Sequence, residues 1–343
     1  MKNILDNEIY KNDLNKAISS IDLSQLQNKS ILITGGLGLI CSTIVDLLYT
    51  ANLNIKIFIA DINEQFYKER YSNYKDIVYI KYDALNDINF NISVDYIIHG
   101  AGLASPELYV EKPVETMLSN FNGLLNLLNY AKDKNVKRLL YISSSEVYGI
   151  KSNNNSFIES EFGSVNINDV RSSYSEAKRS SEVLCRAFSK EYGINTVIVR
   201  PGHIYGPTAS PKDKRISSVF CYQAAKGENL VMKSAGQQMR SYCYSIDCAA
   251  QILLVLLNGL CGEAYNIGHS KSTTIKEMAS IVAKAGNVEL IIEDYVKQDP
   301  SFNPMNNSSL DTKKVFSLGY YDIFSVEDGL SHTIEVLKQI LGY

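Results

Sequence analysis

Tyr174 and Lys178 are a tyrosine and a lysine four residues apart. Of all the patterns in this sequence, their spacing most clearly indicates a catalytic pair. In a helix, residues i and i+4 lie on the same face, one turn apart. A lysine ammonium lowers the pKa of a nearby phenol, so Tyr174 can take the proton of an alcohol whose carbon gives up a hydride. Because Tyr-x-x-x-Lys also arises by chance in long charged helices, the pair needs support from its surroundings.

Three serines and a glutamate, Ser143 to Glu146, directly follow the apolar run 139–142. The carboxyl ends of parallel strands are where open α/β sheets bind ligands. A serine hydroxyl there can bond to the reacting oxygen, and Glu146 can abstract an acidified proton from carbon. The alternatives are a polar cap of the strand end for the serines and a carboxylate bonded to backbone for Glu146.

A glycine-rich segment, residues 34–41, follows the first apolar run and opens into a helical pattern. Gly35 and Gly38 let the backbone approach a pyrophosphate, whose charge then lies at the start of the helix, near Leu39 and Ile40. The alternative is an ordinary tight turn. The βαβ context of the segment predicts a dinucleotide cofactor.

An aspartate at the end of the second apolar run, Asp61, can accept hydrogen bonds from the adenosine ribose, and this favours NAD over NADP. Lys68 and Arg70 leave NADP open, since either could turn toward a 2′-phosphate. Asp83, after the third run, is interpreted either as an adenine contact or as a solvated strand end. Ala101 is also assigned to the cofactor site.

Short β-branched runs alternate with helical patterns from about residue 30 to residue 205. Strands that are apolar throughout and separated by helices predict a parallel sheet covered on both faces, a doubly wound α/β fold of the Rossmann type. Residues 114–133 and 174–191 are the most convincing helices, with Met117, Phe121, Leu124, Leu128 and Ala131 on one stripe of the first.

The predicted organisation has three parts. Residues 1–29 form a helical N-terminal extension, and residues 30–205 form the NAD-binding domain, to which 248–270 return as a further buried strand. Residues 206–247 and 271–343 form a smaller C-terminal α/β lobe that binds the substrate, because proline, glycine and polar turns interrupt the earlier rhythm there.

Composition argues against several classes of partner. The net charge of −3 carries no basic excess, so a nucleic-acid partner is not expected. Six scattered cysteines without a CxxC pair predict reduced thiols and no metal site. No apolar stretch is long enough to cross a membrane, and the N-terminus lacks the apolar core of a signal peptide, so we expect a cytoplasmic protein.

Four segments together, residues 34–41, 143–149, 174–178 and 200–207, resemble the nucleotide-sugar epimerase/dehydratase family of extended short-chain dehydrogenases. The resemblance spans nearly the whole chain from residue 29 onward. It implies a seven-stranded sheet, a homodimer formed through a four-helix bundle, and a nucleotide-diphosphate sugar as substrate. It also implies a bound NAD that oxidises the sugar, usually at C4, and is reoxidised after epimerisation, dehydration or decarboxylation.

Within that family the chain is most similar to UDP-glucuronate decarboxylases, through segments 104–109, 165–179 and 240–244. The likeness implies that Ser144 takes the catalytic Ser/Thr position and that Glu146 lies near the C5–C6 end of the sugar. It implies that Arg240 binds the substrate pyrophosphate, with a surface arginine as the alternative. Ser105 and Arg171 are assigned to the substrate by the same segments, and Arg215 is a second candidate for nucleotide contact.

The sequence departs from these patterns at several positions. Cys41 replaces the third glycine of the cofactor loop, which should tighten the packing of helix on strand. Ser145 replaces the aspartate that would protonate a departing C6 hydroxyl in a 4,6-dehydratase. His203 is assigned to the substrate site and stands where the family usually has asparagine. The stretch 304–309 has no basic residue, although the decarboxylases carry an arginine there against the substrate carboxylate.

The leading hypothesis is therefore an NAD-dependent nucleotide-sugar epimerase with transient C4 oxidation, making precursors for a polysaccharide. The alternatives are a UDP-glucuronate decarboxylase, a 4,6-dehydratase, a simple C4 dehydrogenase or reductase, and a non-catalytic NAD-sensing scaffold on the same fold.

Overall fold

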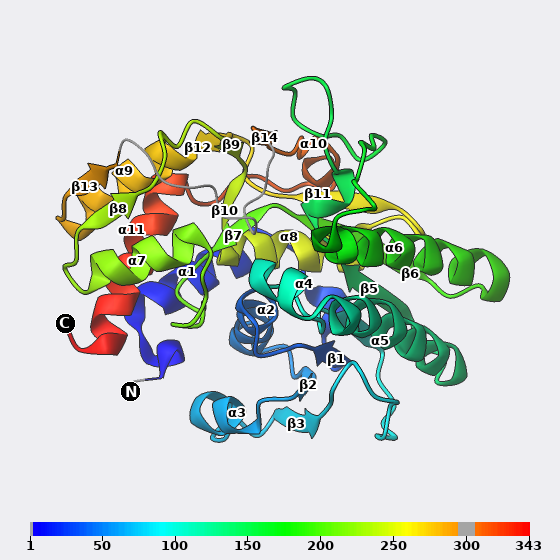
Figure 1. Ribbon diagram of the computed structural model, residues 1–343. Helices are drawn as coiled ribbons and strands as arrows, with labels where there is room; N and C mark the ends of the chain where they lie inside the picture. Colours follow the sequence, from blue (N-terminus) through cyan, green and yellow to red (C-terminus); the bar gives the residue numbers. More distant parts are fainter. Residues whose placement is uncertain (1–2, 294–305) are drawn as a thin grey trace.

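A seven-stranded parallel sheet forms the centre of the computed structural model, which describes residues 3–293 and 306–343 (Figure 1). The strand order is β11-β6-β5-β4-β1-β2-β3, and every neighbouring pair is parallel. The strands are β1 (Ser30–Thr34), β2 (Lys56–Asp61), β3 (Ile77–Lys81), β4 (Tyr96–His99), β5 (Arg138–Ile142), β6 (Thr196–Pro201) and β11 (Ala264–Ile267). The predicted Rossmann-type sheet is thus confirmed, and its order reverses beside β1, where such sheets bind ligands.

Helices cover both faces of this sheet, which explains why its strands are apolar throughout. On β1, Ile31 and Ile33 belong to one buried cluster and Leu32 to another, so successive side chains point to opposite faces. One face is covered by α2 (Leu39–Thr50) and α8 (Ser245–Asn258), and the other by α5 (Pro113–Asp133) and α6 (Ser173–Tyr192). Two shorter helices are α3 (Glu64–Tyr71) and α4 (Pro106–Glu111).

The helix predicted over 114–133 is present as α5, and its predicted stripe is buried except at its start. Met117 is 45% exposed, whereas the neighbouring Thr116 and Asn120 are buried. The polar side chains bond locally, since the Asn120 amide donates to the carbonyls of Leu103 and Thr116. Leu124, Leu128 and Ala131 are buried as predicted, so the expected face is confirmed there and is wrong at Met117.

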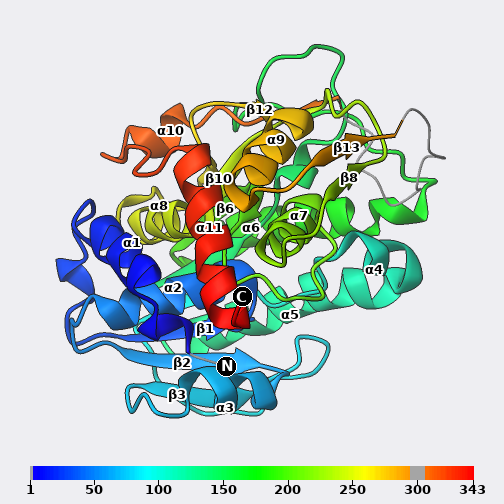
Figure 2. The ribbon, with the colours of Figure 1, turned by 90° about the vertical axis from the view of Figure 1, so that its left-hand side faces the viewer.

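A second lobe follows β6. Its helices are α7 (Ile216–Ala225), α9 (Ile275–Gly286), α10 (Lys313–Phe316) and α11 (Val326–Leu341), and its short strands are β7 (His203–Tyr205), β8 (Leu230–Met232), β9 (Met239–Arg240), β10 (Tyr242–Tyr244), β12 (Thr273–Thr274), β13 (Leu290–Ile292) and β14 (Asn307–Ser308). Figure 2 shows α11 running between α1 on one side and α7 and α9 on the other, and it packs against all three. The lobe lies beside the α2–α8 face of the sheet.

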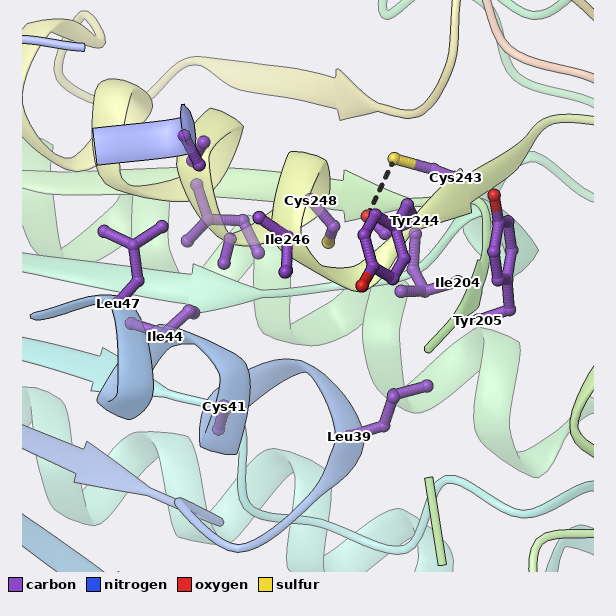
Figure 3. Close-up of a cluster of buried hydrophobic side chains, with 14 of the residues drawn as sticks. Leu39, Cys41, Ile44, Leu47, Ile204, Tyr205, Cys243, Tyr244, Ile246 and Cys248 are labelled. Carbon is purple, nitrogen blue, oxygen red and sulfur yellow. Dashed lines mark hydrogen bonds between the residues drawn. The ribbon is translucent and has the colours of Figure 1, made fainter. Parts of the chain in front are cut away.

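The buried junction between α2 and the second lobe is drawn in Figure 3. Leu39, Cys41 and Ile44 of α2 face side chains that β7, β10 and α8 contribute, among them Ile204, Tyr244 and Cys248. All six cysteines are free thiols, five of them buried, as the scattered spacing predicts. Within the described ranges, no helix is long and apolar enough to cross a membrane, and no cluster of potential metal ligands occurs.

The N-terminal segment is helical and joins the two parts of the molecule. It contains α1 (Glu8–Ile18), between 3-10 turns at Ile4–Asp6 and Ser24–Leu26. The Tyr10 hydroxyl donates to Asp46 of α2 at 2.7 Å. Asp13 accepts from the Tyr244 hydroxyl at 3.0 Å and contacts His332 Nδ1 of α11 at 2.9 Å. The extension is thus bonded to the cofactor side and to the second lobe.

A buried ion pair beneath α1 makes a stability prediction. Asp46 is fully buried and bonds to Arg70, Tyr10 and Tyr71. Replacing Asp46 by alanine leaves the Arg70 guanidinium buried without its carboxylate, so we expect the free energy of unfolding to fall by about 3–5 kcal/mol in urea titrations. Glu64→Ala, which removes an exposed pair with Lys68, should cost less than about 1 kcal/mol. Equal losses in the two variants would contradict this interpretation.

Candidate active site

The glycine-rich loop forms a tight turn between β1 and α2. Gly35 has φ +65°, and a Cβ there would lie 2.8 Å from the backbone nitrogen of Ala101, so this position requires glycine. Gly38 begins α2 without a side-chain cap, which leaves the N–H groups of the first turn, including those of Leu39 and Ile40, for an anion. The loop therefore fits the pyrophosphate of a dinucleotide.

Cys41 lies on the first turn of α2, with its sulfur against Gly100 at the end of β4. A Cβ on Gly100 would collide with that sulfur. Cys41 was expected to crowd the helix against the strand. This crowding is avoided because Gly100, at the strand end, has no side chain in the space that the Cys41 side chain fills.

Asp61 ends β2 beside this loop. Its carboxylate accepts from the backbone N–H groups of Leu37 and Asn63, each at 3.1 Å, and burial raises its pKa despite these bonds. Asp83 accepts from the Leu85 N–H at 3.0 Å, and Ala101 donates to the Thr34 hydroxyl at 3.3 Å. Asp61 therefore holds the loop, and its carboxylate retains lone pairs that fit the predicted hydrogen bonds to a ribose.

The two basic residues that left NADP open are both engaged elsewhere. Arg70 is buried against Asp46, and Lys68 pairs with Glu64 at 2.6 Å on the same helix. For Arg70 to bind a 2′-phosphate, it would have to leave Asp46 buried without its cation. The geometry thus strengthens the preference that Asp61 suggests.

Asp61 gives a cofactor prediction. Asp61→Asn keeps an acceptor for Leu37 but loses the charge that repels a 2′-phosphate, so we expect NAD affinity to fall about 10-fold and NADP affinity to rise. Isothermal titration with both cofactors measures the change, and Glu69→Gln, an exposed residue of α3, should alter neither affinity. An unchanged NADP affinity in Asp61→Asn would show that the carboxylate does not select between them.

Three of the predicted catalytic side chains converge at the carboxyl end of β5. Ser144 caps the 3-10 helix Ser145–Tyr148 and accepts from the Glu146 N–H at 3.2 Å. Tyr174 and Lys178 project from one face of α6, with Lys178 Nζ 5.7 Å from the Tyr174 ring centroid. Lys178 donates to the Ile142 carbonyl at 2.7 Å, which fixes its ammonium at the strand end.

Burial dominates the electrostatics of this pair. It raises the pKa of Tyr174 to about 12, opposed by hydrogen bonding with Ser144 and Tyr109. Burial also lowers the pKa of Lys178 to about 7, so the ammonium gives up its proton near neutral pH. In the chain itself Tyr174 is therefore a phenol, and a further positive charge nearby would favour its ionisation.

The other two serines of the run have different surroundings. Ser143 donates to Glu182 at 2.8 Å, and Glu182 is paired with Arg200 by bonds of 2.8 and 2.7 Å. Ser145 is buried at the start of the 3-10 helix. Ser144 is thus the member of the run that interacts with Tyr174, whereas Ser143 belongs to a buried structural network.

Two contacts around Tyr174 were not predicted from the sequence. The ring of Tyr109, on α4, stacks on the Tyr174 ring with centroids 4.2 Å apart and planes inclined by 7°. Arg171 binds both carboxylate oxygens of Glu146 at 3.1 Å, and its guanidinium lies 5.9 Å from the Tyr109 ring centroid. Glu146 and Arg171, predicted separately as base and substrate ligand, therefore form one ion pair.

A third contact that the sequence did not reveal lies at the end of β4. His99 Nδ1 is 2.7 Å from the Thr34 hydroxyl, and burial, followed by the charge of Lys178, lowers the pKa of His99 to about 3. Its neutral ring lies at the switch point of the sheet. No motif pointed to it, because it follows an ordinary apolar strand.

The predicted substrate residues form a second group on the lobe side. Arg240 is buried, donates to the Met239 carbonyl at 2.8 Å, and forms no ion pair within residues 3–293 and 306–343. Burial lowers its pKa. A buried guanidinium without a carboxylate suits a pyrophosphate. Arg215 is 40% exposed and paired with Asp213, so it is less free to bind an anion.

His203 lies near both arginines. Its Nδ1 is buried and has no hydrogen-bond partner in the described part of the chain, and its ring meets that of Tyr242 edge to face. Burial, followed by the charges of Arg240 and Arg215, lowers the pKa of His203 to about 3, so the imidazole is neutral at pH 7. Its Nδ1 atom can therefore form one hydrogen bond with a polar atom of a ligand.

Two other substrate assignments are less informative. Ser105 occupies the N-cap of α4, but its side chain makes no capping bond there. In the stretch 304–309, residues 304 and 305 lie outside the described residues, and Ser308 stands opposite Arg240 with a buried hydroxyl that has no partner in the described chain. Neutral groups occupy the described part of this stretch.

Comparison with known proteins identifies the family. The model of the NAD dependent epimerase/dehydratase family matches residues 31–268. UDP-glucuronic acid decarboxylase 3 from Arabidopsis thaliana is 35% identical over 282 residues, 80% of each chain. The UDP-N-acetylglucosamine 4-epimerase from Methanobrevibacter ruminantium M1 superimposes with TM-score 0.79 at 26% identity, covering 92% of this chain and 99% of the epimerase.

A third relative was solved with NAD bound. The dTDP-glucose 4,6-dehydratase from Streptomyces venezuelae is 25% identical, with TM-score 0.78, and covers 91% of this chain and 98% of its own. The family is NAD-dependent, and the loop, Asp61 and the uncapped α2 fit that cofactor. The protein is thus an enzyme that uses NAD and belongs to the NAD dependent epimerase/dehydratase family, whose members act on nucleotide-linked sugars.

Proposed function

We propose that the enzyme epimerises a nucleotide-linked sugar through transient oxidation at C4. The observation that carries the proposal is the meeting of Ser144, Tyr174 and Lys178 at the strand end beside the cofactor loop. Bound NAD would supply the hydride acceptor. The neutral residues 306–309 support a sugar without a carboxylate beside them, since such a carboxylate would gain no charge-assisted bond from this stretch.

In this proposal each side chain has one task. Tyr174 takes the proton of the C4 hydroxyl, and Ser144 hydrogen-bonds to the same oxygen. Lys178, held by the Ile142 carbonyl, binds the nicotinamide ribose and stabilises the phenolate. Arg240 binds the pyrophosphate, and His203 contributes a neutral hydrogen bond next to it. Glu146 is a candidate base for a C5 proton, although it must first part from Arg171.

A substrate screen tests the proposal. The purified enzyme is incubated separately with UDP-glucose, UDP-N-acetylglucosamine and UDP-glucuronate, and the products are examined by mass spectrometry and proton NMR. Epimerisation gives a product of unchanged mass with altered ring coupling constants. Loss of carbon dioxide or of water as the main product would overturn the proposal.

The second candidate is decarboxylation of UDP-glucuronate. Curated relatives named UDP-glucuronic acid decarboxylase, 28–35% identical to this chain, favour it. In that case the carboxylate would need another cation, and we propose Arg171, next to Glu146 and Tyr109, for this role. Carbon dioxide released from UDP-glucuronate at an enzymatic rate, and abolished by Arg171→Gln, would make this the better assignment.

Three further alternatives receive less support. Dehydration lacks the acid that Ser145 replaces, and Ser145 is buried in a short helix. A C4 dehydrogenase or reductase would release a keto sugar and consume free cofactor, which the same screen detects. A scaffold that only senses NAD would not need Ser144, Tyr174 and Lys178 together.

The proposal also covers the oligomeric state of the enzyme and its place in the cell. Apolar side chains are exposed on α5 and α6, which pack side by side (Figure 1): Val114, Met117 and Leu118 on α5, and Val183 on α6. They support a homodimer formed through these helices, and a mass measurement by light scattering tests it. We further propose a cytoplasmic enzyme that makes precursors for a polysaccharide.

A further inference from the structure

The ring of Tyr109 packs directly on the ring of Tyr174. The two rings are parallel within 7° with centroids 4.2 Å apart, and both are buried, at 3% and 6% exposure. Hydrogen bonding between the two side chains raises the pKa of Tyr109 and lowers that of Tyr174. No other ring pair in the described chain involves Tyr174.

Neighbouring groups hold Tyr109 in place. It is the buried residue of α4, and its carbonyl accepts from the Ser173 hydroxyl, at the start of α6, at 3.1 Å. The guanidinium of Arg171 lies 5.9 Å from its ring centroid, and Arg171 is itself fixed by Glu146. Tyr109 thus has as neighbours both Tyr174 and a cation that is bound to a carboxylate.

We propose that Tyr109 is a positioning residue for Tyr174: its ring fixes the plane of the phenol by stacking, and its hydroxyl hydrogen-bonds to the oxygen that takes the proton. The inference rests on the proposed function, because it assumes that Tyr174 is the base. It adds a residue to which the sequence assigned no role.

The direction of the hydrogen bond follows from the surroundings of the two phenols. Burial, followed by the charge on Tyr174, raises the pKa of Tyr109 well above its ordinary value, whereas hydrogen bonds from Ser144 and Tyr109 limit the rise at Tyr174. When Tyr174 acts as the base its ionised oxygen can only accept, so the Tyr109 hydroxyl is the donor and keeps its proton. The C4 hydroxyl proton goes to Tyr174, and Tyr109 neither gains nor loses one.

The test compares Tyr109→Phe with the wild type in single turnovers of the NAD-bound enzyme. Reduction of NAD is followed at 340 nm with whichever of UDP-glucose, UDP-N-acetylglucosamine or UDP-glucuronate gives the largest signal. Phenylalanine keeps the stack but not the donor, so the acidic limb of the rate should move to higher pH. We expect a rate about 10-fold below wild type on that limb and a wild-type rate on the alkaline plateau.

A second variant separates stacking from hydrogen bonding. Tyr109→Leu removes both, so its rate should remain about 10-fold below wild type on the plateau as well. Tyr192→Phe, an exposed tyrosine on α6, is the matched control and should follow the wild type. A Tyr109→Phe rate that is unchanged, or reduced equally at every pH, overturns the hydrogen-bonding role. A Tyr109→Leu rate at the wild-type plateau overturns the stacking role.

These failures are distinguishable from failure of the proposed function. If Tyr174→Phe is inactive while the Tyr109 variants behave like wild type, only this inference is lost. If Tyr174→Phe still reduces NAD at the wild-type rate, the assignment of the base is wrong and the inference falls with it.

Discussion

Tyr174→Phe is expected to lower the rate of sugar oxidation by about 10³-fold while NAD remains bound. The phenol oxygen is the proposed proton acceptor, and neither Ser144 nor Tyr109 can take its place, because Ser144 is an alcohol and burial keeps Tyr109 protonated. The ring of phenylalanine fills the same space against Tyr109, so the fold should be retained.

The measurement has two parts. Single-turnover reduction of NAD at 340 nm gives the rate, and the cofactor released on denaturation gives the amount bound. Ser144→Ala provides a graded comparison, since losing one hydrogen bond to the reacting oxygen should cost about 10²-fold. Full activity in Tyr174→Phe would remove the proposed mechanism, and loss of bound NAD would show that the tyrosine acts in binding instead.

Lys178→Met is expected to produce opposite changes in activity and stability. Activity should fall by about 10²-fold or more, because the cation beside the phenolate is lost. The NAD-free protein should become more stable at pH 7, since a buried ammonium with its pKa lowered to about 7 destabilises the folded state. The hydrogen bond lost to Ile142 offsets about 1 kcal/mol of this gain.

The pH dependence identifies the cause. The folded pKa of Lys178 lies below its ordinary unfolded value of 10.5, so between about pH 7 and 10 the unfolded chain binds more protons. The free energy of unfolding of the wild type should therefore rise with pH across that window, and Lys178→Met should remove this rise. Lys190→Met, an exposed lysine on α6, should change neither slope nor activity. Identical slopes in Lys178→Met and wild type would contradict the lowered pKa.

Much of the framework could be predicted from the sequence because it depends on local patterns. Apolar runs gave the strands, and helical spacing placed Tyr174 and Lys178 on one face of α6. The glycine at position 35 is required by the backbone itself, so the loop could be recognised without a structure.

The unpredicted contacts all join residues distant in sequence. Tyr109 and Tyr174 are 65 positions apart, and they meet because α4 packs on the 3-10 turn that precedes α6. Arg70 forms an ion pair with Asp46 because α3 packs near α2, and the hydrophobic periodicity of the sequence does not indicate that packing. Glu146 and Arg171 were each identified by resemblance, but their pairing required the folded chain.

The packing of Cys41 on Gly100 has a consequence for how these two positions can vary. In the usual loop, a third glycine on the helix leaves room for the strand. Here Gly100, at the strand end, leaves room for the Cys41 side chain on the helix instead. A single substitution from this pair either opens a void, as in Cys41→Gly, or forces a clash, as in Gly100→Ala. Either change alone is therefore expected to destabilise the contact of α2 with the strand end, so the side-chain sizes at positions 41 and 100 depend on each other.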